Sequence, residues 1–126
     1  MRIKLRTIVV DCKDARVTAD FYRKLLGWAF TAVEDGWILM RDPKGGTGLS
    51  FQSEEDYAPP VWPEAPGAQK KMLHMDFLVE DLPAAAEHAL ACGAIKAPVQ
   101  FLAGVVVFFD PDGHPFCLFE DGSYAW

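Results

Sequence analysis

The chain has 126 residues, of which 51% are hydrophobic, and a formal net charge of −6 at pH 7. This length and composition predict a globular protein with a sizeable core. Because no run of basic residues is longer than the pair Lys70-Lys71, the charge argues against nucleic acid or an anionic membrane as a partner.

The N-terminal segment and the cysteines indicate a cytoplasmic protein. Arg2, Lys4 and Arg6 interrupt the first apolar residues, so the apolar stretch is too short for a signal peptide or a membrane span. The chain has three cysteines, an odd number without a CxxC motif, which predicts reduced thiols rather than a disulfide framework or a zinc ribbon.

The first half of the chain has the pattern of a strand, a helix and three further strands. An apolar run at 7–14 predicts the first strand, and a helix is predicted at 15–26 with Val17 and Phe21 on its buried face. Gly27 is a natural end for that helix. The three strands that follow are predicted at 28–33, 37–41 and 49–52.

The second half repeats this order. A strand is predicted at 74–81, a helix at 82–92 that ends at Gly93, and three strands at 95–102, 105–109 and 116–119. The two first strands are offset by 74 − 7 = 67 residues, and the Asp-Pro-x-Gly turns that begin at Asp42 and Asp110 are offset by 110 − 42 = 68. These offsets predict a duplicated βαβββ module, with one copy at 1–53 and the other at 72–126.

The modules are joined by a linker at 54–71 that is rich in proline. Its four prolines exclude a regular element. A solvated linker does not favour Tyr57 and Trp62, so we expect the linker to lie over the surface and to place at least one of these rings over a concave site.

Three motifs carry a family resemblance: "ADFYRKLLGW" at 19–28, "LHMDFLVEDL" at 73–82 and "DPDGHPFCLFE" at 110–120. With the doubled module, they make the chain resemble the glyoxalase/bleomycin-resistance/dioxygenase superfamily, which has the vicinal oxygen chelate fold. The resemblance implies a single glyoxalase-like domain over 1–126 in the α+β class. Its two βαβββ modules would form a curved, mixed-sheet cup around a ligand, in a paired-module homodimer.

The resemblance also implies where metal ligands would stand. The matching positions are Thr7, Ser50 or its neighbour Leu49, His74 and Cys117, and only His74 is a conventional ligand. We therefore predict no metal and no cofactor. A pair of His74 and Cys117 with Asp76 or Asp11 as third ligand stays open as an alternative.

Strand alternation predicts which side chains face the cup. Ile8, Val10 and Cys12 should pack on the first helix, and Phe116 and Leu118 on the second. The predicted ligand-binding residues combine polar cup residues with aromatic wall residues. Strand alternation does not assign two of the wall residues, Phe51 and Phe109, to the cup face. They are Thr7, Trp37, Ser50, Phe51, Trp62, His74, Asp76, Phe109, Cys117 and Phe119.

Sixteen Phe, Trp and Tyr residues make up 13% of the chain and favour a ligand with a flat, apolar surface. The favoured interpretation is metal-independent binding of a small aromatic or hydrophobic molecule. It would resemble the antibiotic-sequestering resistance proteins of the superfamily, which hold bleomycin, phenazines or enediynes. The alternative is a metal-dependent lyase, isomerase or dioxygenase. A third possibility is catalysis without metal, with His74 as acid or base or as the group that activates a Cys117 thiolate.

Overall fold

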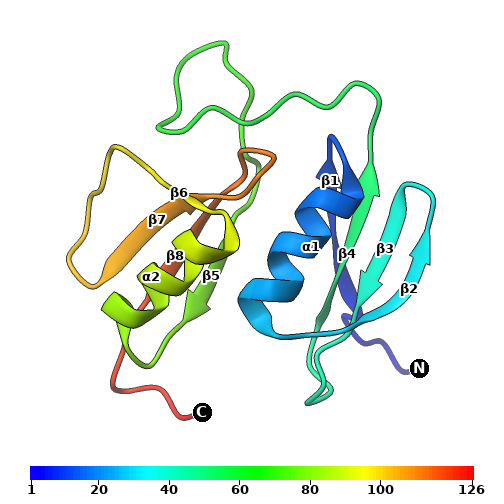
Figure 1. The fold of residues 1–126 in the computed structure, drawn as a ribbon, viewed down its shortest axis with the longest axis horizontal. Coiled ribbons are helices and arrows are strands. Elements are labelled where there is room, and N and C mark those ends of the chain that lie inside the picture. Colours follow the sequence, from blue (N-terminus) through cyan, green and yellow to red (C-terminus); the bar gives the residue numbers. More distant parts are fainter. The chain divides into compact units, whose positions relative to one another are not determined.

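A computed structural model describes all residues, 1–126. Two compact units make up the chain, unit 1 at Met1–Ala58 and unit 2 at Pro59–Trp126. Each unit contains one helix and one four-stranded mixed sheet (Figure 1). The predicted α+β class and the duplicated module are confirmed.

Unit 1 is built around a parallel strand pair. The first strand, β1, lies at the sheet edge beside β4, and the strand order is β1-β4-β3-β2. The pair β1 and β4 is parallel, whereas the other pairs are antiparallel. The elements are β1 (Thr7–Cys12), α1 (Ala15–Leu26), β2 (Phe30–Glu34), β3 (Trp37–Met40) and β4 (Gly48–Ser53).

Unit 2 repeats this topology. Its strand order is β5-β8-β7-β6, and again the first and last strands are the parallel pair. Residues 54–74, which precede β5, form no helix or strand. The elements are β5 (Met75–Leu78), α2 (Leu82–Cys92), β6 (Ile95–Lys96), β7 (Val105–Phe109) and β8 (Pro115–Phe119).

Both helices have the predicted bounds because the chain caps them at each end. The Asp14 carboxylate accepts a hydrogen bond from the Arg16 backbone N–H, and the Asp81 carboxylate accepts one from Ala84. Gly27 ends α1 in the left-handed conformation, with φ of 72°. Neither helix has the length and apolar character needed to cross a membrane.

The buried stripe of α1 differs from the predicted one. Val17 is 49% exposed, so its placement on the buried face was wrong. The stripe follows the i, i+3, i+4, i+7 spacing of a helix that packs on a sheet. Its members are Ala15, Thr18, Ala19 and Tyr22, with Phe21 beside them.

The core of each unit lies between its helix and one face of its sheet. In unit 1 the Tyr22 ring stacks on Phe51 with centroids 5.6 Å apart, and in unit 2 Phe108 stacks on Phe116 at 5.7 Å. All four side chains are fully buried. We call this sheet face the helix face, and the opposite one, which carries the alternate residues, the open face.

The predicted strand at 95–102 is wrong beyond Lys96. One backbone hydrogen bond follows, from the Ala97 N–H to the Val107 carbonyl at 3.0 Å, and a side chain then takes over the contact with β7. The Gln100 side chain donates to the Val107 carbonyl (2.9 Å) and accepts from the Val107 N–H (2.8 Å). It also donates to the Ala97 carbonyl at 2.9 Å. Pro98, which has no N–H, stands in the segment that leaves the sheet.

The Asp-Pro-x-Gly turns have the same hydrogen bond in both units. Gly45 donates to the Asp42 carbonyl and Gly113 to the Asp110 carbonyl, both at 2.9 Å. Only the second turn has a buried anchor, since Asp110 is 2% exposed. Its carboxylate accepts hydrogen bonds from the backbone of Asp112 and His114 and from Nδ1 of His114 at 2.7 Å.

A matched pair of truncations tests this account of the core of unit 2. Phe116→Ala should lower the free energy of unfolding by about 3–5 kcal/mol, because it leaves a cavity beneath α2. Phe101→Ala removes the same atoms from a residue that is 67% exposed, and its cost should be about 1 kcal/mol or less. Urea denaturation of the full chain measures both. Equal losses would contradict the assignment of Phe116 to the core.

Candidate functional site

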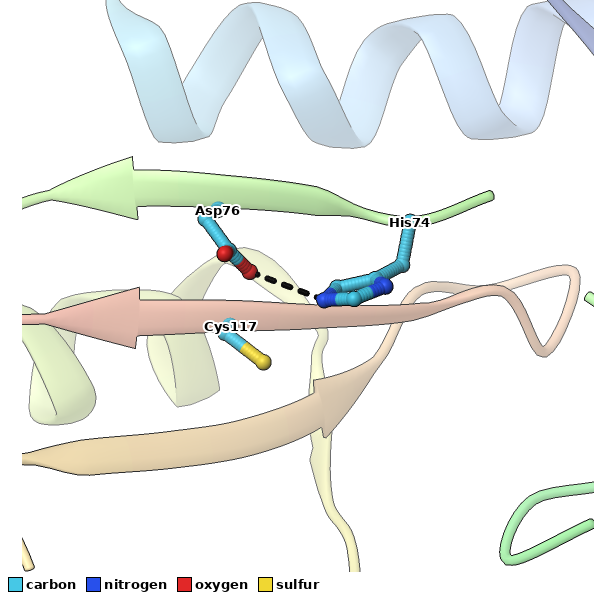
Figure 2. A group of neighbouring side chains, drawn as sticks. All are labelled: His74, Asp76 and Cys117. Atoms are coloured by element: carbon cyan, nitrogen blue, oxygen red, sulfur yellow. Dashed lines mark ion pairs between the residues drawn. The ribbon is translucent and has the colours of Figure 1, made fainter. Parts of the chain in front are cut away.

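The open face of unit 2 brings together three ionisable side chains, one from β5, one from β8 and one from the residue that precedes β5. In the parallel pair of β5 and β8, Asp76 lies directly opposite Cys117. His74 precedes β5 by one residue and Asp76 by two, which places it on the same side of the chain. Figure 2 shows all three side chains on this side, with the imidazole turned toward the carboxylate.

The three side chains are close and remain accessible. Nε2 of His74 lies 3.0 Å from Oδ1 of Asp76, and the side chains are 39% and 56% exposed. One ligand-type atom from each of His74, Asp76 and Cys117 lies within 4.8 Å of the others. The sequence alone did not decide whether His74 and Cys117 lie close together, and the structure shows that they do.

The Cys117 thiol is held in its neutral form. Partial burial, together with the charge of the neighbouring Asp76 carboxylate and a hydrogen bond to it, raises the pKa of Cys117 to about 11. An activated nucleophile needs the opposite shift. The arrangement therefore argues against a reactive Cys117 thiolate near neutral pH.

Unit 1 has different residues at the same three places. Val9 lies opposite Ser50 in the parallel pair of β1 and β4, and Thr7 precedes Val9 by two. Each residue is offset by 67 from its counterpart, since 74 − 7, 76 − 9 and 117 − 50 are equal. The Thr7 and Ser50 hydroxyls hydrogen-bond to each other at 2.8 Å, and Ser50 is fully buried.

Three aromatic rings gather beside the open face of unit 2. The Trp62 ring meets Phe101 edge to face, with centroids 5.5 Å apart, and Phe109 at 6.3 Å. Phe109 is half-buried on β7, and Phe101 is 67% exposed. We call these rings the aromatic group. The predicted site included Trp62 and Phe109 but missed Phe101, for which sequence spacing gives no signal.

The remaining predicted wall residues fall on both faces. Trp37 pairs with Gln52 on the open face of unit 1 and is half-buried. Phe119 is half-buried on the open face of unit 2, where the Tyr124 ring lies 6.0 Å from it. The prediction of Phe51 as a wall residue was wrong, because this ring is fully buried on the helix face against Tyr22.

Comparison with known proteins agrees with the topology. A family model described as "Glyoxalase-like domain" matches residues 7–119. No curated protein matches the chain. Three similar solved structures are each less than 25% identical and show the fold alone.

The first is a glyoxalase/bleomycin resistance protein/dioxygenase family enzyme from Burkholderia phytofirmans PsJN, with a TM-score of 0.71 and 13% identity, covering 94% of this chain and 98% of its own. A possible glyoxalase from Bacillus cereus has a TM-score of 0.69 and 15% identity, with coverage of 94% and 99%. TnmS3, an antibiotic binding protein from Streptomyces sp. CB03234, has a TM-score of 0.65 and 21% identity, with coverage of 97% and 99%.

The raised pKa of Cys117 predicts slow alkylation. At pH 7 iodoacetamide should modify Cys117 about tenfold or more slowly than free N-acetylcysteine, because so little thiolate is present. Asp76→Asn should speed the reaction by removing the charge beside the sulfur. Peptide mass spectrometry after timed quenching measures the rates. A Cys117 rate above that of the free thiol at pH 6–7 would restore the activated-nucleophile hypothesis.

Proposed function

The chain belongs to the glyoxalase-like domain family, and we propose that it binds a small aromatic or hydrophobic molecule without needing a metal ion and without converting it. The ligand class is that of antibiotics with flat or conjugated systems, such as bleomycin, phenazines or enediynes. The observation that carries this proposal is the aromatic group, Trp62, Phe101 and Phe109, beside the open face of unit 2.

The aromatic group is suited to a flat ligand. The Trp62 ring makes edge-to-face contacts with two rings and is only half-buried. Phe101, at 67% exposure, leaves most of its surface to water, so covering it would release water from an apolar surface. Ring–ring contacts contribute about 0.5–1.5 kcal/mol each beyond the buried area.

Polar side chains near these rings would orient the ligand. His74 and Asp76 are exposed on the open face of unit 2, and the neutral Cys117 thiol adds a weak donor. A mostly apolar surface with a few polar groups is the usual composition of small-molecule sites. The proposed contacts in unit 2 are Trp62, His74, Asp76, Phe109, Cys117 and Phe119. In unit 1, Thr7, Trp37 and Ser50 lie on the open face of its own sheet and stay predictions from the sequence.

Metal independence is supported by the residues at the four family ligand positions. Thr7 and Ser50 offer hydroxyls that hydrogen-bond to each other. His74 is the conventional ligand of the set, and a thiol stands at Cys117 instead of a carboxylate. A carboxylate-rich set suited to Fe, Mn, Ni or Mg does not fit these residues.

The likeness to the Streptomyces antibiotic binding protein, TnmS3, is consistent with a binding role, since both chains have the same fold over nearly their whole lengths. A homodimer and a cytoplasmic location complete the proposal. Analytical ultracentrifugation at several protein concentrations tests the dimer, and a single species of monomer mass would exclude it.

A second candidate function is a metal-dependent lyase, isomerase or dioxygenase. The grouping of His74, Asp76 and Cys117 favours it, because these side chains include three metal-ligating types. The two functions differ in the fate of the ligand. Recovery of a converted ligand, with conversion that stops in EDTA, would replace the binding role by the enzymatic one.

Ligand binding in the presence of EDTA tests the binding role. A panel of bleomycin, a phenazine and an enediyne is titrated against the protein while tryptophan fluorescence is followed, and bound ligand is then recovered for chromatography. We expect quenching by at least one compound and recovery of that compound unchanged. No quenching by any member, or quenching that EDTA abolishes, would refute metal-independent binding of these classes.

A pair of tryptophan variants locates the surface. Trp62→Leu should raise the Kd of the bound compound about five- to thirtyfold, which corresponds to about 1–2 kcal/mol of lost ring contact. Trp126→Leu is the control, because Trp126 is 77% exposed near the C-terminus of the same unit. Equilibrium dialysis measures both, since it does not depend on tryptophan emission. Equal effects of the two substitutions on the Kd would show that the aromatic group is not part of the binding site.

A further inference from the structure

A buried guanidinium nitrogen in unit 1 has no hydrogen-bond acceptor in the chain. Arg41 follows the last residue of β3, and its Nη1 atom is the one buried side-chain nitrogen or oxygen without a hydrogen bond. We infer that Arg41 selects ligands that carry a carboxylate on an aromatic system. The inference rests on the proposed function and names the charged group that unit 1 recognises in the ligand.

The strand register places Arg41 on the open face of unit 1. Met40 pairs with Leu49 in the antiparallel sheet, so the next residues along, Arg41 and Gly48, are neighbours. Met40 is buried on the helix face, and alternation turns the side chain that follows it to the open face. On its other side Gly48 pairs with Thr7, which also belongs to the open face.

The glycine at position 48 leaves room for the guanidinium. A Cβ atom at Gly48 would stand 3.5 Å from Nη1 of Arg41 and 2.6 Å from the carbonyl oxygen of Met40. A larger residue would therefore collide with the backbone of β3 and crowd the guanidinium. Arg41 thus lies beside a position that has no side chain.

No carboxylate of the chain pairs with Arg41. The adjacent Asp42 uses its carboxylate within its own turn, where Oδ1 accepts a hydrogen bond from the Lys44 N–H at 2.8 Å and Oδ2 lies over Gly46. The ion pairs of the chain involve other residues. Because no hydrogen bond or ion pair holds the guanidinium, it can turn toward a bound anion without breaking one.

An oxyanion is the group that would satisfy this buried donor. Removing water from a guanidinium N–H costs free energy unless an acceptor replaces the water. The guanidinium presents a planar fork of N–H groups, which matches the two oxygens of a carboxylate. A neutral amide offers one carbonyl oxygen, and its hydrogen bond is weaker because it is not ionised. A carboxylate on the ligand therefore satisfies Arg41 better than an amide does.

The neighbours of Arg41 on the open face suit the aromatic part of such a ligand. Trp37 and Leu39 precede it at alternate positions of β3 and are half-buried. Alternate residues of a strand are about 7 Å apart, so a ring over Leu39 has its substituents within reach of Arg41. Ser50, which pairs with Leu39, is hydrogen-bonded to Thr7 and adds no charge. This part of the open face thus combines apolar side chains with a cation at its end.

Unit 2 has a phenylalanine where unit 1 has Arg41. Arg41 and Phe109 each directly precede the aspartate of an Asp-Pro-x-Gly turn, and Phe109 pairs with Pro115 as Arg41 neighbours Gly48. Since the copy with phenylalanine has the same sheet order, the fold does not require an arginine there. Phe109 belongs to the aromatic group. The two equivalent positions therefore supply a ring in unit 2 and a charge in unit 1.

A pair of probes that differ in one group tests the inference. Phenazine-1-carboxylate and its neutral analogue, phenazine-1-carboxamide, are compared by equilibrium dialysis in EDTA near neutral pH. The full native chain is measured beside Arg41→Gln, Arg41→Met and Lys44→Gln. The last variant is the matched control, because it removes the same charge from an exposed residue of the adjoining turn. Thermal melts of each variant report its folding and stability.

The native chain should bind the carboxylate about tenfold more tightly than the carboxamide, because a hydrogen bond between charged groups is stronger than one to a neutral group. Both substitutions of Arg41 should abolish this preference with little change in the Kd of the carboxamide, and Lys44→Gln should keep it. Arg41→Met removes a buried donor that has no acceptor, so its Tm should equal or exceed that of the native chain. A merely structural arginine would instead lower the Tm and weaken both probes alike.

Equal affinity of the native chain for the two probes would overturn the inference and leave aromatic binding intact. Loss of the preference in Lys44→Gln would also overturn it, since the general charge of this region would then suffice. Displacement of the carboxylate by inorganic phosphate, with a higher Tm in phosphate alone, would reveal a site for a free oxyanion instead. Failure to bind either phenazine overturns the inference, whereas the proposed function fails only if bleomycin and the enediyne are not bound either.

Discussion

The parallel pairing of the first and last strands in each unit determines most of what this structure can do. A parallel pair needs a crossover between its strands, and the helix in each crossover covers one face of the sheet. The opposite face is left with residues that are 41 positions apart and directly opposite, such as Val9 and Ser50 or Asp76 and Cys117. Residues remote in sequence become immediate neighbours without any contribution from a loop.

This arrangement separates stability from chemistry. The helix faces hold the fully buried rings, Phe51 in unit 1 and Phe108 and Phe116 in unit 2. The open faces hold the polar side chains, which are uncharged hydroxyls at Thr7 and Ser50 and ionisable groups in unit 2. Because both units share one topology, the difference between their open faces reflects side-chain choice and not backbone geometry.

Local signals in the sequence predicted the helices, whereas contacts between distant segments were harder to foresee. Glycine after each helix marked the ends of α1 and α2. Alternation placed His74, Asp76 and Cys117 on one face, but their mutual distances needed the strand register. Phe51 was misplaced because adjacent residues of a strand point to opposite faces. The contact of Trp62 with Phe101 joins two segments without regular structure, where no periodicity exists to predict it.

The Gln100 side chain has a further consequence for β7, whose sequence is VVVFF. A β-branched and aromatic run with unpaired backbone groups is prone to pair with strands of other molecules. β6 is only two residues long and leaves part of this strand without a backbone partner. The Gln100 amide bonds both the N–H and the carbonyl of Val107, and the Ala97 N–H donates to the same carbonyl at 3.0 Å, so the edge is covered at that point. We expect these contacts to keep this part of the β7 edge from serving as a template for strands of other molecules.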